Sequence, residues 1–415
     1  MLRYLFILLV FPLLSTQPPA GAEVKPNKVK SGLEVLMSLD FKPLQGKRVG
    51  LITNPTGVTS ELKSTIDVLF ESDKVNLVAL FGPEHGVRGE FAAGEKIESA
   101  IDPVTKIPIY SLYGTATKPT SEMLKEIDVL VYDIQDIGCR SYTYISTMGL
   151  AMDAAAEAGI EFMVLDRPNP LGGEKIEGPI AEKELFSLVG AFPIPYVYGL
   201  TAGELSRMIN KEVWLKNGKS CRLTVIKMKG WKRSMQFKDT GLPWVPSSPH
   251  VPLAETACHY VSTGILGELG VIHIGIGYTL PFGILGHKKM DAVKIAAELN
   301  EYYKGNAIFR PMTYKPFYGG SANELLQGVQ LYIKNPELVT LMSIQFKFME
   351  VFHKNYPEVD LYELSAKRHD MFDKVNGTRA IREKFFANYS YRDIEPMILQ
   401  DVESFQKFSS KYYLY

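Results

Sequence analysis

Polar side chains that can do acid–base chemistry follow several apolar stretches of the sequence. Glu84 stands between Pro83 and His85, directly after one such stretch. Partial burial there can raise the pKa of the carboxyl group and suit it to act as a general acid. Hydrolysis of a glycosidic bond needs a second carboxylate, and Asp133 or Asp136 can supply it after another apolar stretch. These residues favour acid–base catalysis on a polar, sugar-like substrate.

The candidate site extends beyond the carboxylates, because four polar segments share the same position after an apolar run. They are Asn54-Pro-Thr-Gly57, Gly82-Pro-Glu-His-Gly86, Asp133-Ile-Gln-Asp136 with Arg140, and Asp166-Arg-Pro-Asn169. In an open parallel sheet, ligands bind where the carboxyl ends of the strands meet. Aromatic residues nearby can stack on sugar faces and hydrogen-bond to hydroxyl groups. The residues expected to bind substrate are therefore Asn54, His85, Gln135, Tyr142, Asp166, Arg167, Asn169 and Tyr198.

Each segment also has a structural interpretation. Asn-Pro and Asp-Arg-Pro-Asn are good turn formers, and an aspartate after a strand is often a helix cap. Glu84 can pair with Arg88, and Asp136 with Arg140, as ion pairs that only stabilise the fold. The convergence of four such segments at one edge is what favours a site.

Other chemistries find less support in the sequence. The motifs of dinucleotide-binding, P-loop, zincin and simple serine-hydrolase proteins are missing. A metal site of His85, Asp133, Asp136 and Asp166 is the weaker alternative, because the seven histidines show no i,i+4 or His-x-His spacing. Cys139 is expected to be a packed, small hydrophobic residue. We therefore expect neither a metal nor a cofactor.

Alternating apolar runs and helical patterns provide the frame for these segments. The predicted strands cover 48–53, 76–81, 107–112, 128–132 and 162–165, with helices predicted at 60–71, 121–126 and 143–158. This alternation is typical of βα units around a mostly parallel, buried sheet. Further on, we predict a helix at 202–210, a strand at 222–228, helices at 291–303, 336–353 and 395–412, and a strand at 328–333. The proline-rich stretch 243–252 is expected to form a boundary loop or one wall of a cleft.

Length and composition indicate an ordinary globular protein of two domains. The chain has 415 residues, and its 46 Lys and Arg balance 46 Asp and Glu. Zero net charge, without a run of like charges, argues against nucleic acid as a partner. Three cysteines are too few for a disulfide scaffold.

The first 22 residues have the pattern of a secretory signal. Arg3 precedes an apolar run from Tyr4 to Leu14, and Ala20-Gly-Ala22 is a small-residue cleavage site. The run is shorter than the roughly 20 residues of a membrane-spanning helix. We therefore expect a signal peptide at 1–22, a protein exported to the periplasm or the cell exterior, and no stable membrane anchor after cleavage.

The strand-end segments resemble those of a known family, the YbbC/NamZ-type exo-β-N-acetylmuramidases, formerly a domain of unknown function. The resemblance spans nearly the whole mature chain. Its motifs are Asn54-Pro-Thr-Gly57, Phe81 to Gly86, Tyr132 to Gly138 with Arg140 to Tyr144, Asp166 to Gly173, Glu177-Gly-Pro179, Tyr198 to Glu204, Pro311 to Pro316, Gly328-Val-Gln330, Phe372 to Thr378 and Tyr412 to Tyr415.

The resemblance implies a Rossmann-like N-terminal domain at 23–240, a smaller C-terminal α/β domain at 241–415, and a cleft between them. It implies release of N-acetylmuramic acid from the non-reducing ends of peptidoglycan fragments, with Glu84 as acid/base. The substrate is thus a peptidoglycan-derived glycan or muropeptide. Its lactyl carboxylate calls for a cation, which Arg88, Arg140 or Arg167 can supply through a bidentate contact.

One segment, 258–283, departs from the family pattern. Ile276 stands where family members have a glycine-flanked arginine, and Gly283 where they have a glutamate after Pro-Phe. Glu268 or His273 are the candidates to take their place. The departure motivates an alternative function, a muropeptide-binding protein of the same fold with altered or lost catalysis.

Overall fold

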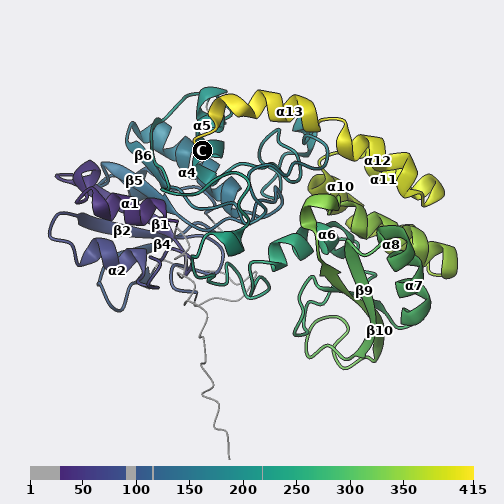
Figure 1. Cartoon of the computed structure of the whole chain (residues 1–415). Coiled ribbons are helices and arrows are strands. Elements are labelled where there is room, and N and C mark those ends of the chain that lie inside the picture. Colours follow the sequence, from purple (N-terminus) through teal and green to yellow (C-terminus); the bar gives the residue numbers. More distant parts are fainter. Residues whose placement is uncertain (1–28, 90–99, 115, 217) are drawn as a thin grey trace, which may run out of the picture.

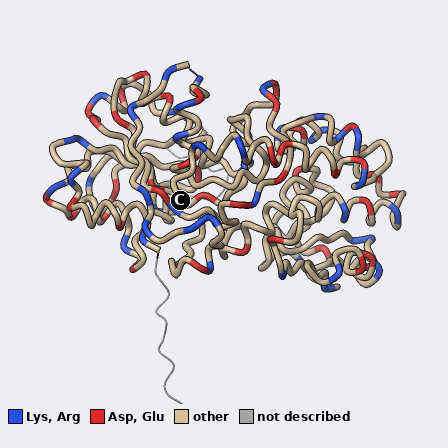
Figure 2. Tube along the Cα trace, turned by 45° about the horizontal axis from the view of Figure 1, so that its top comes forward, with Lys and Arg blue, Asp and Glu red and all other residues tan. Residues whose placement is uncertain are grey.

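The computed structural model of the chain describes residues 29–89, 100–114, 116–216 and 218–415 (Figure 1). The predicted signal peptide, 1–22, lies outside the described residues. Within them no helix is both long and apolar enough to cross a membrane. Figure 2 shows Lys and Arg interspersed with Asp and Glu along the trace.

A large, mostly parallel sheet forms the first part of the molecule, at the left of Figure 1. In the described residues it has seven strands in the order β3-β4-β2-β1-β5-β6-β7, and only the β3–β4 pair is antiparallel. The strands are β1 (Arg48–Thr53), β2 (Asn76–Gly82), β3 (Ala100–Ile101), β4 (Pro108–Ser111), β5 (Val129–Asp133), β6 (Glu161–Leu165) and β7 (Arg222–Ile226).

Helices cover both faces of this sheet, because its central strands are apolar on both sides. In β5, Val131 packs with the core that includes α1 and α2, whereas Leu130 and Tyr132 pack with the core that includes α4 and α5. This doubly wound arrangement is Rossmann-like. The helices are α1 (Gly32–Ser38), α2 (Thr65–Phe70), α3 (Ser121–Leu124), α4 (Tyr144–Ala158) and α5 (Ala202–Lys211).

The second part of the molecule contains a small antiparallel sheet in the order β8-β10-β9, at the right of Figure 1. Its strands are β8 (Ile284–His287), β9 (Ala307–Tyr314) and β10 (Leu326–Ile333). The predicted fold class, a Rossmann-like sheet followed by a smaller α/β unit, is confirmed. The helices are α6 (Thr256–Gly267), α7 (Ala292–Tyr303), α8 (Ser343–Asn355), α9 (Leu361–Leu364), α10 (His369–Asn376), α11 (Ala380–Asn388), α12 (Tyr391–Leu399) and α13 (Val402–Ser409).

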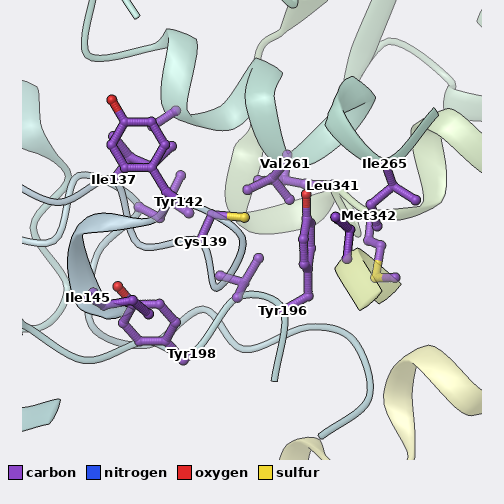
Figure 3. Close-up of a cluster of buried hydrophobic side chains, with 14 of the residues drawn as sticks. Ile137, Cys139, Tyr142, Ile145, Tyr196, Tyr198, Val261, Ile265, Leu341 and Met342 are labelled. Carbon is purple, nitrogen blue, oxygen red and sulfur yellow. The ribbon is translucent and has the colours of Figure 1, made fainter. Parts of the chain in front are cut away.

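The two parts share one hydrophobic core. Figure 3 shows Cys139 and Tyr196 of the first part beside Val261 of α6 and beside Met342, which precedes α8. The chain then returns along α13, and the hydroxyl of Tyr415 donates to Asp166 at the end of β6 (2.7 Å). The predicted boundary between 240 and 241 stays a prediction, because this packing is continuous across it.

Candidate functional site

The site lies where the connections of the large sheet change direction. From β1 the chain runs outward through β2 to β4, and it then crosses back to β5 on the other side of β1. Thr53 and Asp133, the last residues of β1 and β5, are in register. Asn54 and the segment that ends at Asp136 therefore leave the sheet at its switch point, where α/β proteins bind ligands.

Asn54 and Asp136 each present a buried polar atom without a partner among the described residues. The Oδ1 atom of Asn54 accepts from the main-chain N–H of Thr56 (3.0 Å), but its Nδ2 has no acceptor. The Oδ2 atom of Asp136 accepts from the Tyr198 hydroxyl and from the N–H of Gly138 (2.7 Å), whereas its Oδ1 has no donor. Burial raises the pKa of the Asp136 carboxyl to about 6, although these hydrogen bonds act in the opposite direction.

The segment after Asp136 depends on a glycine. Gly138 has a φ of 78°, and a Cβ atom there would lie 2.2 Å from Oδ1 of Asn169. Any larger residue would therefore displace either this turn or Asn169. The turn after Asp136 therefore packs directly against Asn169, in the segment that follows β6.

Glu84 lies on a turn directly after β2 and is partly exposed. His85, next to it, has a φ of 76°, in the left-handed region that non-glycine residues rarely adopt. The Tyr113 hydroxyl, just beyond β4, hydrogen-bonds to Glu84, and its pKa is raised by burial and by that carboxylate. Burial and, to a smaller extent, the charge of Glu84 also raise the pKa of Tyr144. Glu84 thus shares a tyrosine-rich neighbourhood with Asn54, whose side-chain amide lowers the pKa of the same Tyr144 hydroxyl.

The stretch 243–252 closes this neighbourhood from the other side. The hydroxyl of Tyr142 lies 2.7 Å from Oγ of Ser247, and the hydroxyl of Tyr144 donates to the Ser247 carbonyl (2.5 Å). His250 has a lowered pKa because of burial and because His85 is near. Its Nε2 lies 2.8 Å from the hydroxyl of Tyr318. The second part of the molecule therefore reaches the strand-end site through Tyr318.

Asp133 and Arg167 form a buried ion pair beside the site. Nε of Arg167 lies 2.5 Å from Oδ1 of Asp133, and Nη2 lies 2.9 Å from Oδ2. The Thr65 hydroxyl also donates to Asp133 (2.5 Å). These contacts fix Asp133 as an anchor between β5, β6 and α2. Arg167 also borders a small pocket, with Gln135 and Trp244 among its lining residues.

The other predicted residues make contacts that hold the fold. Arg140 is fully buried and donates to the carbonyls of Pro179, Ile194 and Val375 at 2.6–3.0 Å, and burial lowers the pKa of its guanidinium to about 10. Arg88 pairs with Asp102 (2.7 Å) and Asp67 (3.2 Å).

Two further predicted residues tie β6 to α5. Asp166 accepts from the Thr201 hydroxyl (2.7 Å) and from the main-chain N–H of Gly203 (2.8 Å), at the start of α5. Asn169 donates to the carbonyl of Leu200 (3.0 Å). Burial raises the pKa of Asp166 to about 6.

The structure thus gathers Asn54, Glu84, His85, Gln135, Asp136, Tyr142 and Tyr198 around the switch point. Sequence reasoning did not single out four of their neighbours, Tyr113, Ser247, His250 and Tyr318. Tyr113 directly follows a predicted strand, so the rule that found Glu84 could have found it as well. Ser247 and His250 lie in the proline-rich stretch that was expected to line a cleft. Tyr318 carried no signal, since only tertiary packing brings it here.

The divergent segment lies in the second part of the molecule. Glu268 follows α6 and pairs with Arg368 (3.4 Å). Nδ1 of His273 lies 2.8 Å from the hydroxyl of Tyr314, and Nε2 lies 2.8 Å from the Ile276 carbonyl. Among the residues that the structure describes, no three His, Cys, Asp or Glu side chains converge as a metal site would require.

Comparisons with known proteins identify the family of this chain. Residues 49–255 match the family described as exo-β-N-acetylmuramidase NamZ, N-terminal, and residues 258–415 match its C-terminal counterpart. The chain is 43% identical over 391 residues to the peptidoglycan β-N-acetylmuramidase NamZ of Bacillus subtilis (strain 168), covering 94% of this chain and 92% of that protein.

Two crystal structures of DUF1343 family proteins from Bacteroides fragilis NCTC 9343 are also similar. One has 52% identity and a TM-score of 0.88, and the other has 31% identity and a TM-score of 0.71. Each comparison covers 94% of this chain and 99% of the other. The chain therefore belongs to the NamZ family of exo-β-N-acetylmuramidases.

Proposed function

We propose that this protein hydrolyses the terminal β-glycosidic bond of peptidoglycan fragments and releases N-acetylmuramic acid, with Glu84 as the proton donor. The observation that carries the proposal is the position of Glu84. It lies on a strained turn at the ligand-binding edge of the sheet, hydrogen-bonded by Tyr113. The curated relative that shares 43% identity carries the same activity in its name.

The geometry suits the two charges that develop during glycoside hydrolysis. The leaving oxygen needs a proton, and Glu84 is partly exposed and so can reach a bound substrate. The sugar ring becomes positively charged, and Asp136 is the nearby carboxylate that is free on one oxygen atom. Asp133 stays with Arg167, so it takes no direct part in the reaction.

The lactyl carboxylate of muramic acid needs a cation, and we assign it to Arg167. This side chain borders the small pocket that Gln135 and Trp244 also line. Its Nε and Nη2 atoms already donate to Asp133. Arg140 donates to main-chain carbonyls inside the protein, so its guanidinium group is not available to the lactyl carboxylate.

We further propose that residues 1–22 direct export and are then removed. Export would place the enzyme in the compartment where cell-wall fragments arise. Mass spectrometry of the protein recovered from the periplasm or the medium should give an N-terminus at Glu23. Recovery of the full-length chain from the cytoplasm alone would contradict this part of the proposal.

The reaction itself is tested by incubating residues 23–415 with a disaccharide of N-acetylmuramic acid β-linked to N-acetylglucosamine. We expect mass spectrometry to show both free sugars. Calorimetric binding of the disaccharide by folded protein without release of either sugar would overturn the proposal. That result would favour the binding-protein alternative.

A further inference from the structure

The two unpartnered atoms at the switch point are opposite in kind. Nδ2 of Asn54 is a hydrogen-bond donor, and Oδ1 of Asp136 is an acceptor when the carboxyl group is ionised. Buried polar atoms of native proteins are nearly always paired, and each exception calls for a partner from water, an ion or a ligand. Both residues stand where α/β sheets bind ligands, so a ligand is the partner to consider first.

A short chain of hydrogen bonds connects these two residues. The Thr56 hydroxyl donates to Oδ1 of Asn54 (2.5 Å) and accepts from the main-chain N–H of Gln135 (2.8 Å), the residue before Asp136. The rings of Tyr142 and Tyr144 form a second link, with centroids 4.9 Å apart. The side-chain amide of Asn54 lowers the pKa of the Tyr144 hydroxyl, and the charge of Asp136 raises the pKa of the Tyr142 hydroxyl. The donor and the acceptor therefore belong to one small polar cluster.

We propose that Asn54 and Asp136 hold the 2-acetamido group of the substrate sugar, an inference that rests on the proposed function. Nδ2 of Asn54 donates to the acetamido oxygen, and Oδ1 of Asp136 accepts the acetamido N–H. A secondary amide carries one acceptor and one donor, which are the two kinds of partner that these orphaned atoms lack. Both atoms are closed to water, so the groups around them must move as the sugar enters.

An acetamido group held in this way supplies the nucleophile. Its oxygen bonds to C1 of the sugar while the glycosidic bond breaks, and the glycosidic oxygen leaves with the electron pair and takes the proton of Glu84. The ionised Asp136 stabilises the N–H of the resulting oxazolinium ring. Water then adds to C1, Glu84 takes back a proton, and the ring opens to N-acetylmuramic acid with its β configuration retained. The protein therefore needs no carboxylate nucleophile.

The acyl group of the substrate is the direct test. Chromogenic β-muramides that differ only in the acyl group (acetyl, fluoroacetyl, difluoroacetyl and trifluoroacetyl) should lose kcat progressively, by roughly a hundredfold or more across the series. The reason is that each fluorine weakens the nucleophilic oxygen. Equal kcat values across the series would overturn the inference and leave the proposed function intact. Failure to cleave the acetyl compound at all would instead overturn the proposed function.

Variants test the two residues separately from their effect on folding. Asn54→Ala and Asp136→Asn should weaken binding of the N-acetylmuramic acid thiazoline, which mimics the cyclic intermediate, at least tenfold more than binding of N-acetylglucosamine product. Asn376→Ala is the matched control, because Asn376 is a buried asparagine with an unpartnered Oδ1 on α10. We expect it to lower stability without changing thiazoline binding. If all three variants bound the thiazoline as wild type does, Asn54 and Asp136 would have no acetamido-binding role.

Discussion

At the scale of single residues, Asp136 combines burial with an incomplete hydrogen-bond shell. Its pKa is raised from 3.8 to about 6 because burial penalises the charged form. The folded protein therefore binds this proton more tightly than the unfolded chain does. The carboxyl group makes its full contribution to stability below pH 3.8, and this contribution is lost as the pH rises through about 6.

Asp136→Asn should consequently be more stable than wild type at pH 8, by roughly 3 kcal/mol at most, and the difference should vanish toward pH 4. The same substitution should abolish turnover, because the neutral amide cannot stabilise a cation. Chemical unfolding at several pH values, alongside kinetics, measures both effects. A stability difference that does not change with pH would show that Asp136 titrates normally.

Arg167 makes a different kind of contribution, since its loss would leave Asp133 buried and unpaired. Arg167→Met should lower the free energy of unfolding by about 3–5 kcal/mol. Lys354→Ala, which breaks the exposed pair with Glu298, should lower the free energy of unfolding far less, because water screens that pair. Urea unfolding measures the loss of free energy of unfolding in each variant. Equal losses would mean that the Asp133–Arg167 pair does not anchor this edge of the sheet.

At the scale of elements, Tyr318 joins the loop before β10 to the stretch 243–252. Tyr318→Phe removes its hydrogen bond to His250, which is worth about 1 kcal/mol, and should raise KM roughly fivefold with little change in kcat. Tyr302→Phe, on the exposed face of α7, is the control. Unchanged KM in Tyr318→Phe would show that this loop does not contribute to substrate binding.

The first sheet was largely predictable, because its strands are short, continuous apolar runs. The predicted strand at 48–53 coincides with β1, and the other four agree with β2, β4, β5 and β6 to within one or two residues at each end. β8, β9 and α6 were missed, since glycines interrupt the pattern from 264 to 286 and β9 is exposed on one side. The helix predicted at 336–353 is wrong for the residues that precede α8. There the main-chain N–H groups of Leu341 and Met342 donate to the Glu177 carboxylate (3.0 and 2.9 Å) instead of continuing a helix.

The site was predictable only in part, for a similar reason. Strand-end residues are close in space because the sheet is parallel, so Asn54, Glu84 and Asp136 could be grouped from the sequence. Contacts between distant segments, such as Ser247 with Tyr142, depend on tertiary packing that leaves no local pattern. The sequence also could not show that Arg140 donates inward to three carbonyl groups.

At the scale of the whole molecule, the two parts are bound by a shared core and by the returning chain end. The hydroxyl of Tyr415 donates to Asp166 and accepts from the N–H of Met228 (2.8 Å). We therefore expect calorimetry to show one unfolding transition for residues 23–415. Tyr415→Phe should lower the free energy of unfolding by about 1–3 kcal/mol, and the protein should still unfold in one transition. Two separate transitions in the wild-type protein would contradict this coupling.

Comparing two leaving groups in Glu84→Gln shows whether Glu84 is the proton donor. The natural disaccharide needs a proton on its leaving oxygen, whereas dinitrophenolate leaves without one. We predict that the substitution lowers kcat on the disaccharide by roughly a thousandfold, lowers kcat on dinitrophenyl β-N-acetylmuramide far less, and leaves thermal unfolding unchanged. Near-normal turnover of the disaccharide, or an equal loss on both substrates, would show that Glu84 is not the proton donor.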